Sequence, residues 1–240
     1  MKPNNTLGKL YLIPTTMGDC DPMDVLPQTI KRAIDLIDYY IVENEKTARK
    51  SIKQVQPEKK QSELILFALN KRTEPQEHKE FIKPLLEGKD MGLMSEAGCP
   101  GVADPGAVIV KLAHEKGIQV VPLVGPSSIL LAMMASGMNG QSFTFHGYLP
   151  IEKGEKKATL KVLERISQER NQSQIFIETP YRNNKMLEDL LILLNPETHL
   201  CIAADITLST EYIKTKKAKE WKKETVDLHN RPAIFIIHKM

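Results

Sequence analysis

Short apolar runs alternate with longer amphipathic segments along the first half of the chain. The runs LYLIP and YYIV are rich in residues that favour strands, whereas residues 22–38 place apolar side chains at helical spacing. Strands that alternate with helices in this way are joined by crossovers and form a parallel sheet. The pattern predicts strands at residues 9–14, 39–42, 63–68, 91–94 and 118–123, with helices at 22–38, 46–54, 75–87 and 105–116.

Punctuating residues mark the ends of several of these helices. Asp104 is expected to cap the helix that follows it, with Pro105 in the first turn. Gly88 and Gly117 are expected to end helices, because glycine adopts the left-handed conformation without strain.

The second half of the chain mixes strand types. Residues 129–136 are apolar on nearly every side and predict a helix buried between layers, with Met133, Met134 and Met138 as core filler. Antiparallel partners are expected around the last strands. Further strands are expected at residues 143–149, 174–178, 199–203 and 234–238, with helices at 157–170 and 184–194.

The organisation is therefore that of two α/β domains, the first with a mainly parallel sheet and the second with a mixed sheet. The small-residue loop at 125–128 is the best candidate for a boundary, which gives an N-terminal α/β domain at 1–123 and a C-terminal α/β domain at 124–240.

Loops rich in small, proline and acidic residues follow four of the predicted strands, at residues 14–19, 95–104, 124–128 and 178–183. Ligands of open α/β sheets bind outside the carboxyl ends of the strands. Glycine lets a ligand approach the backbone, and proline stiffens the approach. The pattern favours a nucleotide-like ligand held largely by main chain; the alternative is a set of ordinary tight turns that bind nothing.

Composition and charge exclude several classes of protein. The apolar fraction is 41% and the charged fraction 26%, as in soluble globular proteins, and no run approaches a membrane span. The N-terminal apolar stretch is too short for a signal peptide, so a cytoplasmic protein is expected. The widely separated Cys20, Cys99 and Cys201 argue against a zinc site, a disulfide framework and an iron–sulfur cluster, and no metal site is expected.

The net charge of +3 does not by itself imply a nucleic-acid partner. Lysines nevertheless gather in two segments, residues 152–161 and 214–223. Such clusters can meet phosphates, or they can be ordinary solvated faces.

Familiar site motifs are missing. The glycines fit neither the G-x-G-x-x-G pattern nor a Walker loop, which leaves a standard Rossmann or P-loop site unsupported. The absence of a G-x-S-x-G elbow weakens hydrolase readings.

Five ordered strings carry a family resemblance: LYLIPTTMGD, SEAGCPGVADPG, GIQVVPLVGPSS, FTFHGYLP and IFIETPYR. Together they resemble the tetrapyrrole-methylase superfamily of S-adenosyl-L-methionine-dependent methyltransferases, and most closely its branch of ribosomal RNA small subunit methyltransferase I. The resemblance spans nearly the whole chain. It implies a homodimer, an S-adenosyl-L-methionine cofactor in a cleft between two α/β domains, and methyl transfer to a ribose 2′-hydroxyl of 16S rRNA, alone or in a ribosomal subunit.

The resemblance also implies site residues. Backbone amides near a helix N-terminus suit the carboxylate of the methionine moiety, and apolar walls suit the adenine. The cofactor-binding candidates are Pro14, Met17, Gly98, Cys99, Pro100, Val102, Ser127, Ser128, Ile177, Glu178 and Ala203. The catalytic candidates are Glu45, Tyr181 and Arg182, which sit at predicted strand ends and can orient a hydroxyl or a phosphate; each can equally be a cap or a surface ion pair.

Two alternatives to an RNA methyltransferase stay open. One is a methylase of a small tetrapyrrole-like substrate. The other is a non-catalytic module that binds S-adenosylmethionine, suggested by residues 43–46 and 204–208, where the chain departs from the pattern of the rRNA branch.

Overall fold

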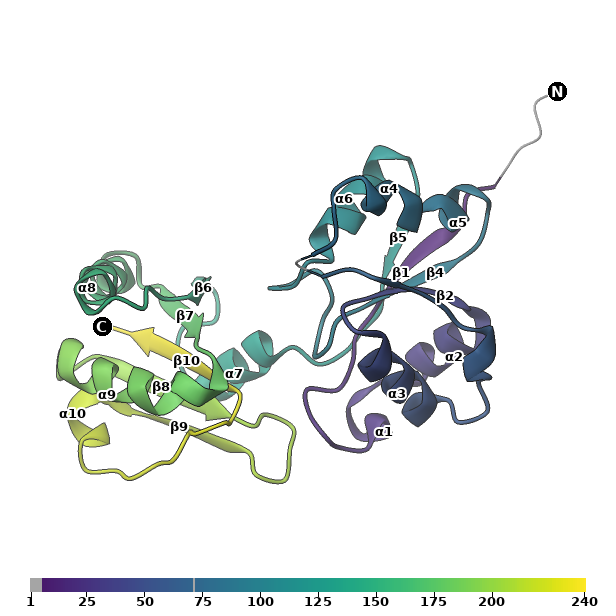
Figure 1. Ribbon diagram of the computed structural model, residues 1–240. Helices are drawn as coiled ribbons and strands as arrows, with labels where there is room; N and C mark the ends of the chain where they lie inside the picture. The colour runs from purple at the N-terminus through teal and green to yellow at the C-terminus, as the bar shows by residue number, and fades with distance from the viewer. Residues whose placement is uncertain (1–5, 71) are drawn as a thin grey trace. The chain divides into compact units, whose positions relative to one another are not determined.

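The computed structural model describes residues 6–70 and 72–240. Two compact units follow one another along the chain, the first ending at Ser127 and the second beginning at Ser128 (Figure 1). Each unit is built on its own five-stranded sheet, and the two sheets share no strand.

The first unit contains a parallel sheet with the strand order β3-β2-β4-β1-β5. Strand β1 pairs with β4 on one side and β5 on the other, so that Leu10 lies beside Met91 and Val120. The parallel sheet expected from the alternating pattern is confirmed. Its strands are β1 Lys9–Ile13, β2 Tyr39–Val42, β3 Ile65–Ala68, β4 Met91–Met94 and β5 Gln119–Pro122.

Helices cover both faces of this sheet, as right-handed crossovers in opposite directions require. Helices α2 (Gln28–Leu36) and α3 (Glu45–Val55) pack on the face that carries Ile13 and Met94 (Figure 1). Helix α6 (Ala107–Glu115) packs with two short helices on the opposite face, which carries Leu10 and Leu93. The strands are therefore buried from both sides.

Proline breaks two of the predicted helices. The segment 22–38 forms α1 (Pro22–Val25) and then α2, because Pro27 forces Leu26 into an extended conformation. The segment 75–87 divides into α4 (Glu77–Phe81) and α5 (Lys83–Leu86), since Pro84 lacks the amide that would continue the ladder. The single helices expected there were wrong.

Asp104 does not cap α6 directly. The helix begins at Ala107, and Asp104 Oδ1 instead accepts hydrogen bonds of 2.7 Å from the amides of Gly101 and Gly106. The predicted cap closes the loop that precedes the helix. The glycine stops are confirmed, since Gly88 and Gly117 have φ angles of +85° and +69°.

The second unit has the predicted mixed sheet, with the order β6-β7-β10-β8-β9. Strands β6 and β7 are parallel, and the remaining neighbours are antiparallel. The strands are β6 Phe143–Tyr148, β7 Ser173–Ile177, β8 His199–Ala204, β9 Tyr212–Lys217 and β10 Ala233–His238. The lysine-rich segment supplies edge strand β9 and short helix α10 (Ala218–Trp221).

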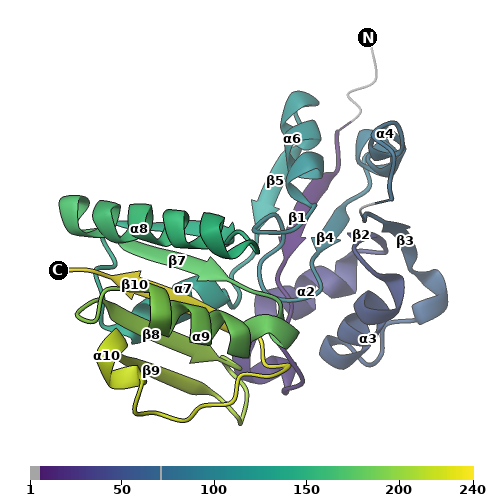
Figure 2. The ribbon, with the colours of Figure 1, turned by 60° about the vertical axis from the view of Figure 1, so that its left-hand side comes forward.

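Helices α8 (Lys153–Arg170) and α9 (Asn183–Leu193) lie on one face of the mixed sheet and α7 (Ser128–Ser136) on the other (Figure 2). The expectation that α7 is buried on all sides was wrong. Met133 faces the sheet and is buried, but Met134 is 78% exposed and Leu130 54% exposed on the outward side. The outer side of α7 has no covering layer within its unit.

A buried ion pair joins α8 to α9. Lys156 Nζ donates to Asp189 Oδ2 at 2.8 Å, and each side chain is only 6% exposed. Removing one partner of such a pair leaves an uncompensated buried charge. Lys156 is therefore a structural lysine, although it belongs to a predicted phosphate-binding cluster.

We expect Asp189→Asn to lower the free energy of unfolding by about 3 kcal/mol, because it strands the ammonium of Lys156 in the core. The matched control is Glu63→Gln, which removes the exposed pair with Lys60; the expected loss there is below about 1 kcal/mol. Urea denaturation of both variants measures the difference. Equal effects would show that Lys156 is not held by Asp189.

Candidate functional site

The loops after three neighbouring parallel strands meet at one edge of the first unit's sheet. Thr15, after β1, donates its amide to the carbonyl of Gly98, after β4, at 3.0 Å. Cys99 Sγ donates to the carbonyl of Pro126, after β5, at 3.3 Å. Parallel pairing of β1 with both neighbours places these loops side by side, so segments more than 80 residues apart form one structure.

The contact is close enough to require glycine. A Cβ on Gly125 would lie 2.2 Å from Cβ of Pro14, far inside van der Waals contact. A Cβ on Gly98 would lie 3.4 Å from the carbonyl oxygen of Pro126 and 4.0 Å from Met17, and its φ of +71° itself favours glycine. The structure thus brings together Pro14, Met17, Gly98 and Cys99, all predicted cofactor-binding residues.

The loop between β4 and α6 is braced from inside. Ser95 Oγ donates to the carbonyl of Gly98 at 3.1 Å, while Asp104 ties Gly101 to Gly106. Outward from these ties the main chain is accessible: nothing lies within 4 Å of a Cβ built on Gly101, and Val102 is 51% exposed. Within residues 6–70 and 72–240, the amides of Val102 and Ala103 donate to no protein acceptor. This fixed main-chain surface fits a ligand that carries a carboxylate.

Cys99 is a hydrogen-bond donor here rather than a nucleophile. Burial raises the pKa of its thiol above the ordinary value, and the thiol donates to backbone carbonyls. Within the described part of the chain, no group of three or more His, Cys, Asp or Glu side chains can hold a metal ion. The same residues contain no helix long and apolar enough to span a membrane.

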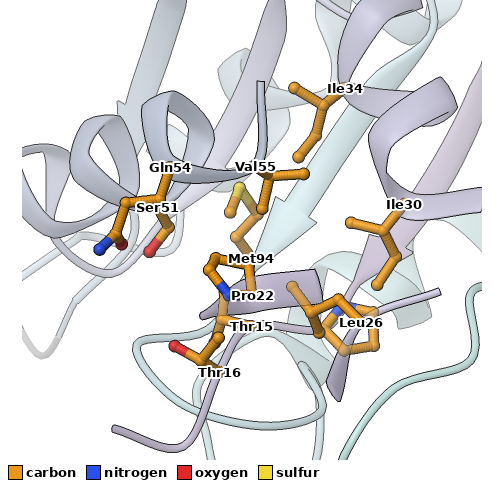
Figure 3. A pocket seen from close by; sticks show the side chains of 11 residues that line it. Thr15, Thr16, Pro22, Leu26, Ile30, Ile34, Ser51, Gln54, Val55 and Met94 are labelled. Atoms are coloured by element: carbon orange, nitrogen blue, oxygen red, sulfur yellow. The ribbon is translucent and has the colours of Figure 1, made fainter. Parts of the chain in front are cut away.

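Two hollows flank the loop after β1. One lies beneath it, between the ends of β1 and β4 and helices α1 to α3; Figure 3 shows Pro22, Leu26, Ile30 and Met94 pointing into it. The other is an open groove of about 570 Å³, including solvent at its mouth. The space in it that water-sized molecules can occupy is about 220 Å³, below the roughly 300–1,000 Å³ of typical small-ligand sites. The groove is lined by residues Thr16 to Asp19, Thr47, Lys50, Ser51, Gln54, Glu96 and Ala97.

Glu45 does not line this groove. It is the exposed first residue of α3, and two residues along a helix is a turn of about 200°, so it faces away from Thr47. Thr47 Oγ1, in contrast, donates to Glu96 Oε1 at 3.2 Å at the groove wall. The proposed catalytic role of Glu45 stays a prediction.

Glu43 is a carboxylate at this sheet edge that the sequence pattern did not single out. It follows β2 directly and lies half-buried beside Asp104 in a small hollow at the end of the sheet. Burial, and then the negative charges of Asp104 and Glu96, raise the pKa of Glu43. Burial likewise raises the pKa of Asp104, against the two amides that lower it. Its position immediately after a buried strand is the sequence signal that could have singled out Glu43.

Two predicted residues of the second unit share one row of its sheet. Ile234 of β10 pairs with Ile177 on one side and with Ala203 on the other. Side chains of paired residues point to the same face, and this is the face that α7 covers. Ser128 begins α7, and Ser127 is the last residue of the first unit.

Glu178, Tyr181 and Arg182 form a cluster just after β7. Oε1 of the buried Glu178 accepts from the amide of Thr179 at 2.6 Å and from Arg182 at 2.7 Å. The Arg182 guanidinium lies 5.3 Å from the centre of the Tyr181 ring. Burial pushes the pKa of Glu178 upward, but the bonds from Thr179 and Arg182 outweigh burial and hold the pKa below its ordinary value. Arg182 is thus held in place as a fixed cation.

Comparison with known proteins relates the sequence to methyltransferases. The sequence profile described as Tetrapyrrole (Corrin/Porphyrin) Methylases matches residues 9–222. The chain is 29% identical over 235 residues to a Vibrio cholerae protein named ribosomal RNA small subunit methyltransferase I, covering 95% of this chain and 76% of that protein. It is 30% identical over 252 residues to the protein of the same name from Buchnera aphidicola of Schizaphis graminum, covering 99% and 80%.

Solved structures share the fold at low identity. The methyltransferase CobJ superposes with a TM-score of 0.65 at 16% identity, covering 97% of this chain and 94% of that one. A uroporphyrin-III C-methyltransferase from Thermus thermophilus, solved with S-adenosylhomocysteine, superposes with a TM-score of 0.55 at 16% identity, covering 96% and 97%. The two-sheet α/β architecture is therefore shared with these enzymes.

We expect Gly125→Ala to destabilise the first unit by roughly 1–3 kcal/mol, because the new methyl group overlaps Pro14 and forces the loops apart. Gly140→Ala is the matched control, since a Cβ there meets nothing within 4 Å. Thermal unfolding and limited proteolysis of both variants provide the readout. A Gly125→Ala protein as stable as Gly140→Ala would contradict the close contact of these loops.

Proposed function

Because the chain belongs to the tetrapyrrole (corrin/porphyrin) methylase family, we propose that it transfers a methyl group from S-adenosyl-L-methionine to a ribose 2′-hydroxyl of ribosomal RNA. The observation that carries the proposal is the fixed main-chain surface at residues 95–106. It is supported by relatives that are named for rRNA methylation and that align with almost the entire chain. When bound, the cofactor supplies a methyl group on a positively charged sulfur.

In the first unit, the proposed cofactor contacts are those of the three meeting loops. The free amides of Val102 and Ala103 bind the carboxylate of the cofactor, and the Cβ-less Gly98 and Gly101 let it approach the backbone. Pro14 and Met17 supply apolar contact. The remaining proposed contacts of this unit are Cys99, Pro100 and Ser127.

In the second unit, Ser128, Ile177, Glu178 and Ala203 are the proposed cofactor contacts. Oε1 of Glu178 is occupied by donors from its own unit, which leaves its second oxygen for a ligand. Ala203 presents only a methyl group in a row between isoleucines, and so leaves room above the sheet.

Glu45, Tyr181 and Arg182 are proposed to act on the acceptor. Arg182 is the best supported, since a fixed guanidinium suits a phosphate beside the reacting hydroxyl. An exposed Tyr181 adds a ring face for a base. Because orientation of two reactants contributes much of the rate in such transfers, these residues position the acceptor rather than activate it chemically.

A small tetrapyrrole-like acceptor is the second candidate, favoured by the description of the family itself. We further propose a homodimer that works in the cytoplasm, where ribosomal subunits are assembled. Light scattering at micromolar concentration tests the dimer; a single species of 27.1 kDa would contradict it.

Transfer of radiolabelled methyl groups tests the function directly. Ribosomal subunits from cells that lack the protein are incubated with the protein and labelled cofactor, with a tetrapyrrole as the parallel acceptor. We expect label in ribosomal RNA, located by mass spectrometry as a 2′-O-methyl nucleotide. Label found only in the tetrapyrrole would contradict the RNA acceptor and support the tetrapyrrole-like acceptor instead. Binding of S-adenosylhomocysteine in calorimetry without any transfer would indicate a non-catalytic module.

We expect Arg182→Ala to reduce methyl transfer at least tenfold while the affinity for S-adenosylhomocysteine changes less than twofold. The variant also breaks the ion pair with Glu178. Because the folded-state pKa of Glu178 lies below its ordinary 4.5, the pair stabilises the protein above that pH and is lost as the pH falls further. The stability difference between the two proteins should therefore shrink below pH 4.5. Unchanged transfer kinetics would remove Arg182 from the acceptor site.

A further inference from the structure

Three lysines form a row along α8. Lys153, Lys157 and Lys161 are four residues apart, so they lie on one side of the helix and span about 12 Å along its axis. All three are exposed. Among the described residues, no carboxylate lies within ion-pairing distance of their ammonium groups, whereas the buried Lys156 between them is paired with Asp189.

This arrangement works against the helix that carries it. Like charges four residues apart destabilise a helix by about 0.2–0.5 kcal/mol per pair. The first two lysines also lie in the opening turns of α8, where the helix dipole disfavours cations. Glu152 caps the same end through the amide of Glu155 at 2.7 Å, so its carboxylate is already engaged. A local conflict of this kind is typical of a functional surface.

The other lysine-rich segment, at residues 214–223, is different. Lys214 and Lys216 both pair with Glu224, while Lys217 and Lys219 both pair with Glu197. The lysine pairs hold the pKa of each glutamate at about 2, so both carboxylates stay ionised and offset the positive charge. Four of the six lysines in that segment are thus ion-paired, all except Lys222 and Lys223, whereas none of the three lysines of the α8 row is ion-paired within the described residues.

The row begins at the sheet edge that carries the proposed acceptor residues. Tyr148, five residues before Lys153, pairs in register with Ile177, next to Glu178. Tyr148 and Tyr181 are each 61% exposed, and both lie close enough to Arg182 to add, after Glu178, to the rise in the pKa of its guanidinium. Exposed aromatic rings next to an unpaired cationic row combine the two features that bind single-stranded nucleic acid: stacking platforms and phosphate contacts.

We propose that α8 is an RNA-binding surface: phosphates of a single-stranded segment lie along Lys153, Lys157 and Lys161, and bases stack on Tyr148 and Tyr181. The proposal rests on the RNA acceptor proposed above and extends it by naming the surface. The proposed contacts between RNA and α8 are separate from those between the cofactor and the loops of the first unit. The lysine row should therefore contribute to the affinity for RNA and have no effect on the affinity for the cofactor.

The test is the salt dependence of RNA binding by the triple variant Lys153→Gln, Lys157→Gln, Lys161→Gln. Each phosphate contact to a single strand contributes about 0.7 to the slope of log K against log salt. We expect the slope to fall by about 2, with roughly 10- to 100-fold weaker binding at 0.1 M salt. The KM for RNA should rise in step, with kcat at saturation and the affinity for S-adenosylhomocysteine unchanged.

The matched control is Lys216→Gln, Lys217→Gln, Lys219→Gln, which removes the same formal charge from the paired segment. We expect its slope to change by less than 1. Equal losses in the two variants would overturn the proposal, because they would show a general charge effect. Wild-type protein that binds no RNA would overturn the RNA acceptor as well, whereas RNA binding by wild type with an unaffected α8 variant would overturn this surface alone.

A second pair of variants tests the aromatic half. Tyr148→Ala should weaken RNA binding roughly fivefold or more, since stacking contributes about 1–3 kcal/mol per base, while Tyr148→Phe should retain it. Loss in both variants would assign the effect to the hydroxyl, and loss in neither would remove Tyr148 from the surface.

Discussion

The parallel pairing of β1 between β4 and β5 is the constraint from which the rest of the first unit follows. It brings three loops from distant parts of the sequence to one edge, where Gly125 lies so close to Pro14 that no side chain fits between them. This close packing of the loops leaves the outer main chain of residues 101–103 fixed and accessible. A site built this way is determined by strand order and glycine placement more than by charged side chains, which agrees with the absence of a familiar catalytic motif.

The second unit applies a different principle. Its strand-end cluster is held by electrostatics: Glu178 is buried, accepts from the backbone and from Arg182, and thereby fixes a cation at an otherwise open edge. The lysines follow the same division between fixed and free charge. Those paired with Glu197 or Glu224, and Lys156 with Asp189, belong to the fold. The unpaired row on α8 is the cationic surface that we propose for a polyanion.

Much of the fold was readable from the sequence because it depends on local signals. Strand β4 lies where the apolar run predicted it, and Gly88 and Gly117 end segments through their backbone freedom. The helix breaks at Pro27 and Pro84 also depend on local chemistry. The prediction missed them because it followed the spacing of the apolar residues and gave too little weight to these prolines. The exposed side of α7 was not predictable, because an apolar helix has the same sequence pattern whether or not another layer covers it.

The site was predictable in part. The glycine-rich loops were found because their composition is distinctive, and the structure joins Pro14, Met17, Gly98 and Cys99 at one edge. Glu43 was missed because its pKa is raised by burial in the folded unit and then by the charges of Asp104 and Glu96, which lie more than 50 residues away in the sequence. Which lysines are neutralised likewise depends on partners across the sheet. A single sequence does not show which charged residues, far apart along the chain, become paired in the folded protein.

The central claim is that a methyl donor is held by the main chain of the loops after β1 and β4. Hydrogen–deuterium exchange with and without S-adenosylhomocysteine tests it most directly. The expected result is slower exchange of the amides in residues 98–103, with unchanged exchange in α5, which packs against the start of β1 rather than its end. Unaltered exchange in residues 98–103 on saturation with the ligand, or protection confined to other segments, would contradict the claim.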